Sequence, residues 1–163
     1  MTWRTSDIPD LTGRRAVITG VTGGLGVHTA IGLARHGASL VVTARDAKKA
    51  DEALARIEQG APGAGVDVIS LDLADLADTK RAAGEVVAAY DRVDILVNNA
   101  GFVRDRMLVN CSEEEWDAVI RVHLKGHFCI SSHACNHWRA RAKDGKPVSG
   151  RIINTSSGAG LQG

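Results

Sequence analysis

The first apolar segment of the chain reads Arg15-Ala16-Val17-Ile18-Thr19-Gly20-Val21-Thr22-Gly23-Gly24-Leu25-Gly26. This stretch predicts a short buried strand, a glycine-rich turn and the first turn of a helix. Backbone amides at a helix start point outwards and carry the positive end of the helix dipole, so they attract anions. Glycines let the chain turn tightly and let phosphate groups approach the bare backbone. The stretch therefore predicts a pyrophosphate site, although a glycine cluster alone could also be an ordinary loop.

Apolar segments and helical segments alternate along the whole chain. We expect strands over residues 15–19, 39–43, 66–71, 94–97 and 151–155, and helices over 24–36, 46–59, 76–90 and 113–141. Right-handed crossovers turn this alternation into an α/β fold, a doubly wound parallel sheet with helices on both faces. Ligands of such sheets bind at the carboxyl ends of the strands. Several polar or glycine-rich stretches follow predicted strands and are expected to meet there, namely Gly20–Gly26, Arg45, Asp72, Asn98–Gly101 and Ser156–Ser157.

Composition limits the classes of function. The 163 residues suggest one domain, with 44% hydrophobic and 24% charged residues. A formal net charge of +1 gives no reason to expect nucleic acid or an acidic membrane surface as the main partner. No apolar segment approaches the roughly 20 residues of a membrane span. Three cysteines, an odd number, favour free thiols in a reducing compartment. We expect a cytoplasmic protein with no membrane or nucleic-acid partner.

Two motifs carry a resemblance to the short-chain dehydrogenase/reductase family. Thr19-Gly20-x-x-x-Gly24-Leu25-Gly26 resembles the family's T-G-x-x-x-G-x-G motif, and Asn98-Asn99-Ala100-Gly101 matches its N-N-A-G motif. The resemblance implies a polar leader over residues 1–13 and a C-terminally incomplete, Rossmann-type NAD(P)-binding domain over 14–163. It implies hydride transfer between a nicotinamide cofactor and an alcohol or ketone substrate. The residues that it implies for cofactor binding in these motifs are Gly20, Thr22, Gly24, Leu25, Gly26, Asn99, Ala100 and Gly101.

Two residues after other strands are also candidate cofactor contacts. Arg45 stands where the adenosine ribose is read, and an arginine there favours the 2′-phosphate of NADP, with NAD possible. The neighbouring Asp46 carries the opposite charge, or it caps the following helix; a solvated surface arginine is the alternative for Arg45. In the family, the pair Asp72-Leu73 lies beside the adenine. On position alone, Asp72 could equally cap the next turn.

The resemblance also suggests two residues for the chemical step. Ser157 aligns with the family's catalytic serine and would hydrogen-bond the substrate oxygen; a Ser/Gly-rich turn is the alternative. His123 stands where the family usually has an asparagine that holds a water connected to the catalytic lysine. A histidine there could take part in such a relay, or it could be a structural residue with one backbone partner.

Some family features are not found in the sequence. The catalytic Tyr-x-x-x-Lys is expected a dozen or so residues beyond Ser157, and the one tyrosine, Tyr90, is in a predicted helix far from it. We therefore expect the sequence to be a fragment of a longer protein, itself poor in catalysis. By resemblance, that protein forms a homodimer or homotetramer. A non-catalytic nucleotide-binding module and a structural partner subunit are the alternatives.

Two histidine pairs with i,i+4 spacing, His123/His127 and His133/His137, invite a zinc interpretation. The first pair lacks the glutamate of H-E-x-x-H, and no third ligand is evident. We predict no metal site and assign these histidines to packing or to an oligomer face.

Overall fold

The structure, a computed structural model, describes residues 4–157 and contains a five-stranded parallel sheet. Its order is β3-β2-β1-β4-β5, so the chain runs outwards from β1 to one edge and then returns to the other side of β1. This confirms the predicted doubly wound sheet. The strands are β1 (Arg15–Thr19), β2 (Ser39–Ala44), β3 (Val66–Ser70), β4 (Ile95–Asn98) and β5 (Arg151–Asn154).

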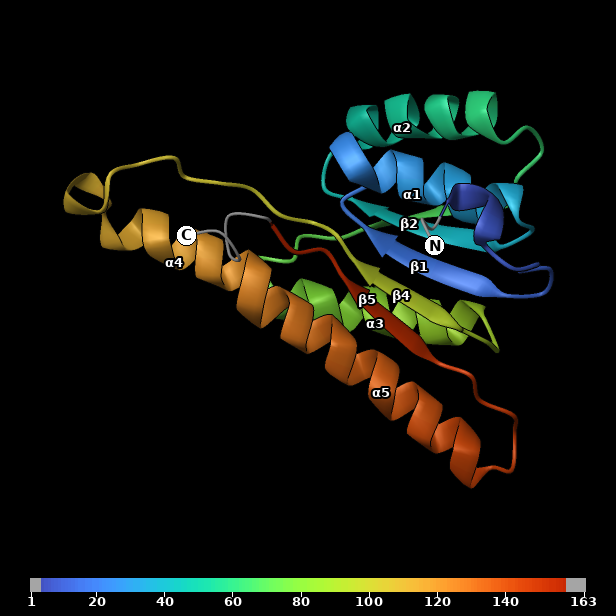
Figure 1. Cartoon of the computed structure of the whole chain (residues 1–163). Helices are drawn as coiled ribbons and strands as arrows, with labels where there is room; N and C mark the ends of the chain where they lie inside the picture. Colours follow the sequence, from blue (N-terminus) through green and yellow to red (C-terminus); the bar gives the residue numbers. More distant parts are fainter. Residues whose placement is uncertain (1–3, 158–163) are drawn as a thin grey trace.

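Helices cover both faces of the sheet (Figure 1). On one face, α1 (Gly24–Arg35) packs against α2 (Ala47–Gly60) and the sheet. On the other face, α3 (Leu76–Ala89) packs against α5 (His127–Lys143). Each face has its own apolar core. Alternate residues of one strand enter different cores, as Ile18 and Val17 of β1 show.

Burial differs between the centre and the edge of the sheet. β1, β2 and β4 are buried almost throughout because helices cover both of their faces. All four residues of β5 are exposed, with Ile152 36% and Ile153 48% exposed. The central strands therefore anchor the carboxyl-end loops, whereas β5 presents apolar side chains at a sheet edge.

The long helix predicted for residues 113–141 contains a π-helical turn. It is built from α4 (Glu113–Ile120), the π turn η3 (Arg121–Gly126) and α5. Phe128, near the start of α5, does not belong to the buried side of this helix, because it is 74% exposed. Val122, Gly126 and Ile130, which are spaced four residues apart, are buried and form the inner side of the long helix.

The segment between β4 and α4 extends beyond the sheet together with α4 (Figure 1). It contains the short helix η2 (Leu108–Asn110), and its side chains Met107, Leu108 and Val109 are each more than 70% exposed. At the other end of the described chain, η1 (Thr5–Asp7) belongs to the leader. Leu11 then joins the core under α1, where its amide donates to the carbonyl of His36.

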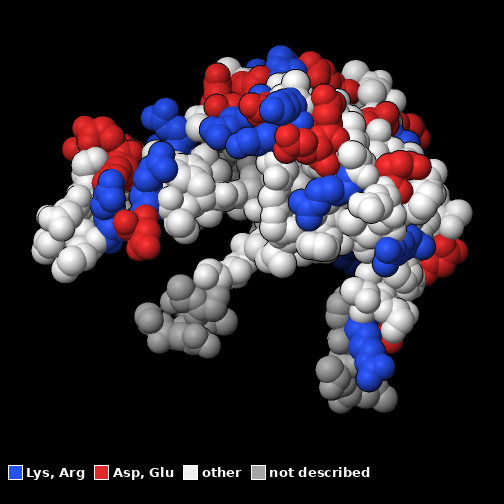
Figure 2. All heavy atoms as spheres, turned by 90° about the horizontal axis from the view of Figure 1, so that it is seen from above, with Lys and Arg blue, Asp and Glu red and all other residues white. Residues whose placement is uncertain are grey.

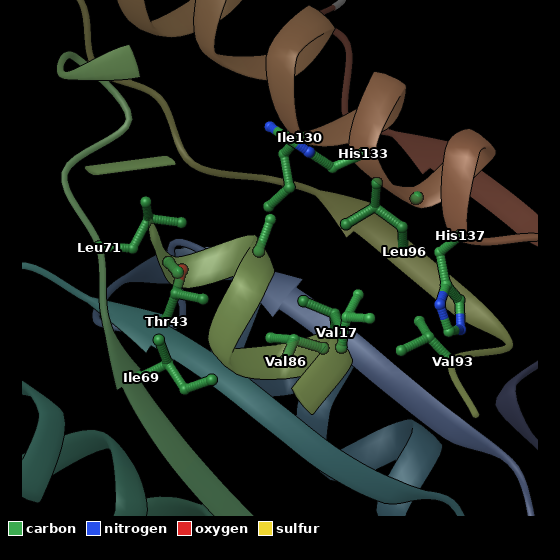
Figure 3. A pocket seen from close by; sticks show the side chains of 14 residues that line it. Val17, Thr43, Ile69, Leu71, Val86, Val93, Leu96, Ile130, His133 and His137 are labelled. Carbon is green, nitrogen blue, oxygen red and sulfur yellow. The ribbon is translucent and has the colours of Figure 1, made fainter. Parts of the chain in front are cut away.

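A cavity of about 50 Å³ lies between the sheet, α3 and α5 (Figure 3). Its walls are almost entirely apolar; Val17, Ile69, Leu96 and Ile130 are examples. Figure 2, seen from above the view of Figure 1, shows acidic and basic side chains intermixed over the face that α2 forms. Neither feature lies at the carboxyl ends of β1 and β4, where the candidate site is found.

Candidate functional site

The glycine turn after β1 needs glycine at the positions that the motif predicts. Gly20 has φ +69°, and a Cβ there would lie 2.5 Å from the Cα of Ala100. A Cβ on Gly26 would lie 2.3 Å from the carbonyl oxygen of Gly20. Gly24 has φ +39° but faces open space, as does Gly23. One side of the turn is therefore packed against the chain, and the other side is open to a ligand.

The start of α1 differs from the starts of α2, α3 and α4, each of which has a side-chain cap. Asp46 caps α2 by accepting from the amide of Lys49, and Asp75 caps α3. Ser112 caps α4 in a capping box. Within the described residues, no side chain caps α1 at Gly23. The first amides of α1 are thus left for an anion at the positive end of its dipole, beside the exposed Thr22 and Leu25.

Asn99 ties the end of β4 to the glycine turn. Its side-chain amide donates to the carbonyls of Thr19, at 3.2 Å, and Gly20, at 3.0 Å. The buried hydroxyl of Thr19 accepts from the backbone amides of Asn99 and Ala100, both at 3.0 Å. The hydroxyl of Thr155, just after β5, donates to the Asn99 side-chain oxygen at 3.2 Å. These bonds therefore hold the carboxyl ends of β1, β4 and β5 together.

Asn98, the preceding residue, supports the same edge from inside. It is fully buried, and its amide donates to Ser131 of α5 at 2.9 Å and to Asn154 of β5 at 2.8 Å. Asn98 was expected at the site as part of the Asn98–Gly101 stretch, whereas Thr19 and Thr155 were not given a role there. The signal for Thr19 is its place in the quoted glycine motif, and the signal for Thr155 is its position at the end of a predicted strand.

Arg45 directly follows β2 and is exposed. Asp46 beside it caps α2 through an oxygen 2.9 Å from the amide of Lys49, as the structural alternative for Asp46 predicted. The Asp46 carboxylate therefore interacts with the start of α2.

Asp72 forms a turn with its own neighbours. Its carboxylate accepts from the amide of Ala74 at 2.9 Å, and its amide donates to Asp78 at 2.7 Å. These bonds match the turn-forming alternative for this residue. Leu73 is buried, and η3 approaches it closely, since a Cβ on Gly126 would lie 2.7 Å from the Leu73 carbonyl oxygen.

His123 and His127 face the segment that follows β4. The Nε2 atom of His123 lies 3.0 Å from the amide nitrogen and 2.8 Å from the carbonyl oxygen of Phe102. The Nε2 atom of His127 lies 2.9 Å from the carbonyl oxygen of Ala100. Burial lowers the pKa of His127, and the nearby His123 lowers it further, although the Ala100 carbonyl acts in the opposite direction. Both rings thus have the backbone partners that a structural role predicts.

Ser157 lies just past Thr155 and is exposed. Tyr90 lies elsewhere, near the amino ends of β1 and β3, whereas the candidate site lies at the carboxyl ends of the strands. Its hydroxyl donates to Asp67 at 2.7 Å, and the guanidinium of Arg15 stacks on its ring at 3.8 Å. Tyr90 is therefore far from the site, as expected.

Among residues 4–157, no group of three or more His, Cys, Asp or Glu side chains could hold a metal ion. None of the helices in that range is both long and apolar enough to cross a membrane.

The chain is similar to proteins of one family over nearly all of its length. A family model described as short chain dehydrogenase matches residues 14–163. The chain is 46% identical over 165 residues to the hydroxyacyl-CoA dehydrogenase ChsB1 of Mycobacterium tuberculosis, covering 98% of the chain and 52% of that protein. It is 38% identical over 154 residues to the 3-oxoacyl-(acyl-carrier-protein) reductase FabG of Thermotoga maritima, covering 94% and 59%. The chain spans about half the length of these curated relatives.

Solved structures give the same result. A short chain dehydrogenase from Mycobacterium avium matches with a TM-score of 0.84 and 41% identity, over 93% of this chain and 56% of the other. A metagenomic short-chain oxidoreductase in complex with NADP matches with a TM-score of 0.79 and 33% identity, over 91% and 64%.

Proposed function

The chain belongs to the short chain dehydrogenase family, and from that premise we propose that the protein is an NAD(P)-dependent oxidoreductase of alcohols or ketones. The observation that carries the proposal is the glycine turn. It packs tightly against Ala100 on one side, and on the other it opens beside an uncapped helix start. This arrangement suits a dinucleotide diphosphate, which binds to free backbone amides and must come close to the backbone of the turn.

Each residue of the site has a proposed part in holding the cofactor. The diphosphate would rest on the amides after Gly23, with Thr22 and Leu25 beside it. Asn99, Ala100 and Gly101 would form the wall towards the nicotinamide. Asp72 and Leu73 would border the adenine, at the carboxyl end of β3. Support comes from the bonds of Asn99 to Thr19 and Gly20, which hold this wall against the turn.

NADP is the proposed cofactor, with NAD as the alternative. Arg45 is exposed at the end of β2, where a guanidinium can pair with a 2′-phosphate. The neighbouring Asp46 caps α2 by accepting from the backbone amide of Lys49, so the start of the helix accounts for an acidic residue at this position. A related solved structure contains NADP, which is consistent with this proposal.

When bound, the nicotinamide ring would supply or accept the hydride. Ser157 would donate its hydroxyl hydrogen bond to the oxygen of the substrate. The proton would come from a tyrosine of a Tyr-x-x-x-Lys motif in the complete protein, because Tyr90 lies near the amino ends of the strands, away from the site. A neighbouring lysine would lower the pKa of that tyrosine, since a nearby cation favours the phenolate.

We also propose that the protein is a cytoplasmic homodimer or homotetramer. Large apolar side chains are exposed on α4, η3 and α5, with Trp116 58%, Leu124 62% and Phe128 74% exposed. Exposed apolar surface of this kind is typical of an interface. The intermixed charges of Figure 2 favour neither nucleic acid nor an anionic membrane as partner.

Cofactor binding tests the proposal. NADPH and NADH are titrated separately into the wild type and into Arg45→Asp, with Arg56→Asp on the exposed side of α2 as the matched charge control. We expect tighter binding of NADPH by the wild type, and a preference moved towards NADH in Arg45→Asp alone. Binding of neither cofactor would contradict the proposed function, and an unchanged preference would contradict the role of Arg45. Binding without turnover of any alcohol or ketone by the complete protein would favour the non-catalytic module.

A further inference from the structure

Two histidine side chains form hydrogen bonds to the backbone segment that follows β4. They stand on consecutive turns, His123 within the π turn η3 and His127 at the start of α5, and their ring centroids are 6.1 Å apart. One ring reaches Phe102 and the other reaches Ala100, so the two bonds are on either side of Gly101. Side chains from a single helix therefore hold three consecutive residues.

Gly101 fits between these bonds only because it has no side chain. A Cβ at Gly101 would lie 2.3 Å from Cε1 of His123 and 2.9 Å from its Nε2. The imidazole thus lies directly against the Gly101 backbone. The ring of Phe102 makes a tilted contact with the His123 ring, and the guanidinium of Arg104 lies 4.9 Å from the centre of the Phe102 ring.

The opposite side of the segment is fixed by the glycine turn. The Ala100 amide donates to the Thr19 hydroxyl, and Gly20 leaves no space for a Cβ beside Ala100. The Ala100–Phe102 backbone is therefore held between the turn that follows β1 and the two imidazoles. Any displacement towards one of them opens a gap at the other.

We propose that His123 and His127 are positioning residues that clamp Ala100–Phe102, and that this clamp sets the wall of the nicotinamide half of the cofactor site. The proposal rests on the proposed function, since it takes the dinucleotide to lie along the glycine turn. It assigns to His123 a structural task through Nε2 in place of a proton relay. Both neutral tautomers of His123 can perform it, by accepting from the Phe102 amide or by donating to the Phe102 carbonyl.

The geometry supplies a test that separates the clamp from the relay. Glutamine places its terminal amide near the position of Nε2 and can both donate and accept, whereas asparagine is one carbon shorter. The clamp predicts that His123→Gln and His127→Gln bind NADPH as tightly as the wild type does. It predicts that His123→Asn, His123→Ala and His127→Ala bind NADPH more weakly. A relay that needs the shorter amide predicts the reverse order for His123→Gln and His123→Asn.

Two probes, each titrated by calorimetry into the protein, report on different halves of the site. NADPH spans both halves, whereas 2′,5′-ADP occupies the adenine half only. The pair NADH and 5′-ADP replaces them if the wild type prefers NADH. We expect the asparagine and alanine variants to bind NADPH about five- to tenfold more weakly, the effect of one lost hydrogen bond. Their affinity for 2′,5′-ADP should stay within twofold of the wild type. Lys125→Gln, an exposed position between the two histidines, is the control and should change neither.

A second set of variants covers the case in which an alanine variant fails to fold. Gly101→Ala should weaken NADPH binding because its methyl group meets the His123 ring. The double variant Gly101→Ala/His123→Gln keeps the same crowding, whereas Gly101→Ala/His123→Ala removes the ring. We expect the second double variant to bind NADPH better than Gly101→Ala alone, and no better than His123→Ala.

Each result supports or overturns the clamp. Selective loss of NADPH binding with glutamine rescue supports it. Parallel loss of both probes, no loss of either, or better function with asparagine than with glutamine at position 123 overturns it. If the wild type binds neither NADPH nor NADH, the proposed function fails instead, and that outcome is visible before any variant is made.

Discussion

The side-chain amide of Asn99 donates to the carbonyl of Gly20 at 3.0 Å, across 79 positions of sequence. This bond joins the residue after β4 to the first glycine of the turn after β1. Gly26 comes close to both partners, since a Cβ there would lie 2.3 Å from the Gly20 oxygen and 2.6 Å from the Asn99 amide nitrogen. The turn is therefore shaped by a contact from a distant strand as well as by its own glycines.

Gly26→Ala should destabilise the protein, because the added methyl group must displace the Gly20 carbonyl or the Asn99 amide. Overpacking of this kind costs about 1–3 kcal/mol. Gly23→Ala is the matched control, because its Cβ would meet nothing within 4 Å and its φ of −151° suits any residue. Urea unfolding measures both free energies. Equal stability of the two variants would show that the close approach at Gly26 is relieved elsewhere.

At the amino ends of β1 and β4, Asp94→Asn should lower the free energy of unfolding more than Asp91→Asn does. Asp94 is 3% exposed and accepts from Arg14 at 2.9 Å, from Arg92 at 2.7 Å and from the Arg15 amide at 2.9 Å. Losing these charge-assisted bonds should cost about 2–3 kcal/mol. Asp91→Asn is the control: Asp91 is 75% exposed, so solvent screens its pairs with Arg141 and Lys146, and their loss should cost clearly less.

The same aspartate predicts a pH dependence. Burial raises the pKa of Asp94, but the bonds from Arg92, the Arg15 amide and Arg14 outweigh it and hold the pKa below its usual value. A depressed carboxyl pKa stabilises the fold above the unfolded value of about 3.9 and loses that contribution as the pH falls through the folded value. The difference in unfolding free energy between the wild type and Asp94→Asn should therefore be constant above about pH 5 and shrink below about pH 4. A difference that persists undiminished at pH 2 would contradict this account.

The fold of this chain was largely readable from its residues, for physical reasons that hold for particular elements. Arg15–Thr19 and Ser39–Ala44 are continuous apolar runs, and only a strand covered on both faces needs such a run. Asp46 and Asp75 mark helix starts by the local rule that a side-chain oxygen caps free amides. Local signals of this kind need no knowledge of the distant chain.

The parts that could not be read depend on distant contacts. The sequence pattern of residues 113–141 predicted one long helix and did not reveal the π turn at Arg121–Gly126 inside it. The i,i+4 spacing of His123 and His127 was visible, but their partners Phe102 and Ala100 lie more than 20 residues away. The glycines of the turn were predicted from spacing, whereas the bond that fixes them comes from Asn99.

His137→Leu should make stability less sensitive to mild acid. His137 borders the cavity of Figure 3, and its Nε2 atom is buried without a hydrogen-bond partner among residues 4–157. Burial lowers its pKa, Arg141 and Lys146 lower it further, and Asp91 opposes them. The unfolded chain, with a histidine pKa of about 6.5, then binds more protons, so stability falls as the pH drops below that value.

Thermal unfolding between pH 7.5 and 5 measures this effect. We expect a shallower fall of Tm for His137→Leu than for the wild type. Identical slopes for the two proteins would show that His137 contributes nothing to the acid sensitivity.

Val86→Ile should stabilise the protein by filling part of the cavity of about 50 Å³ beneath α3. Val86 is 8% exposed and lines this space, and one buried methylene contributes about 0.8 kcal/mol. Val27→Ile, in the fully buried core under α1, is the comparison and should instead destabilise by about 1–3 kcal/mol through overpacking. The same sign for both changes in urea unfolding would contradict the difference in packing between the two cores.

A crystal structure of the protein with NADPH tests the central claim most directly. The account predicts density for the diphosphate against the backbone amides at the start of α1, between Gly23 and Leu25, with the nicotinamide extending towards Ala100–Phe102. Density for the cofactor anywhere else, with the side chains around the glycine turn closing that space, would contradict it.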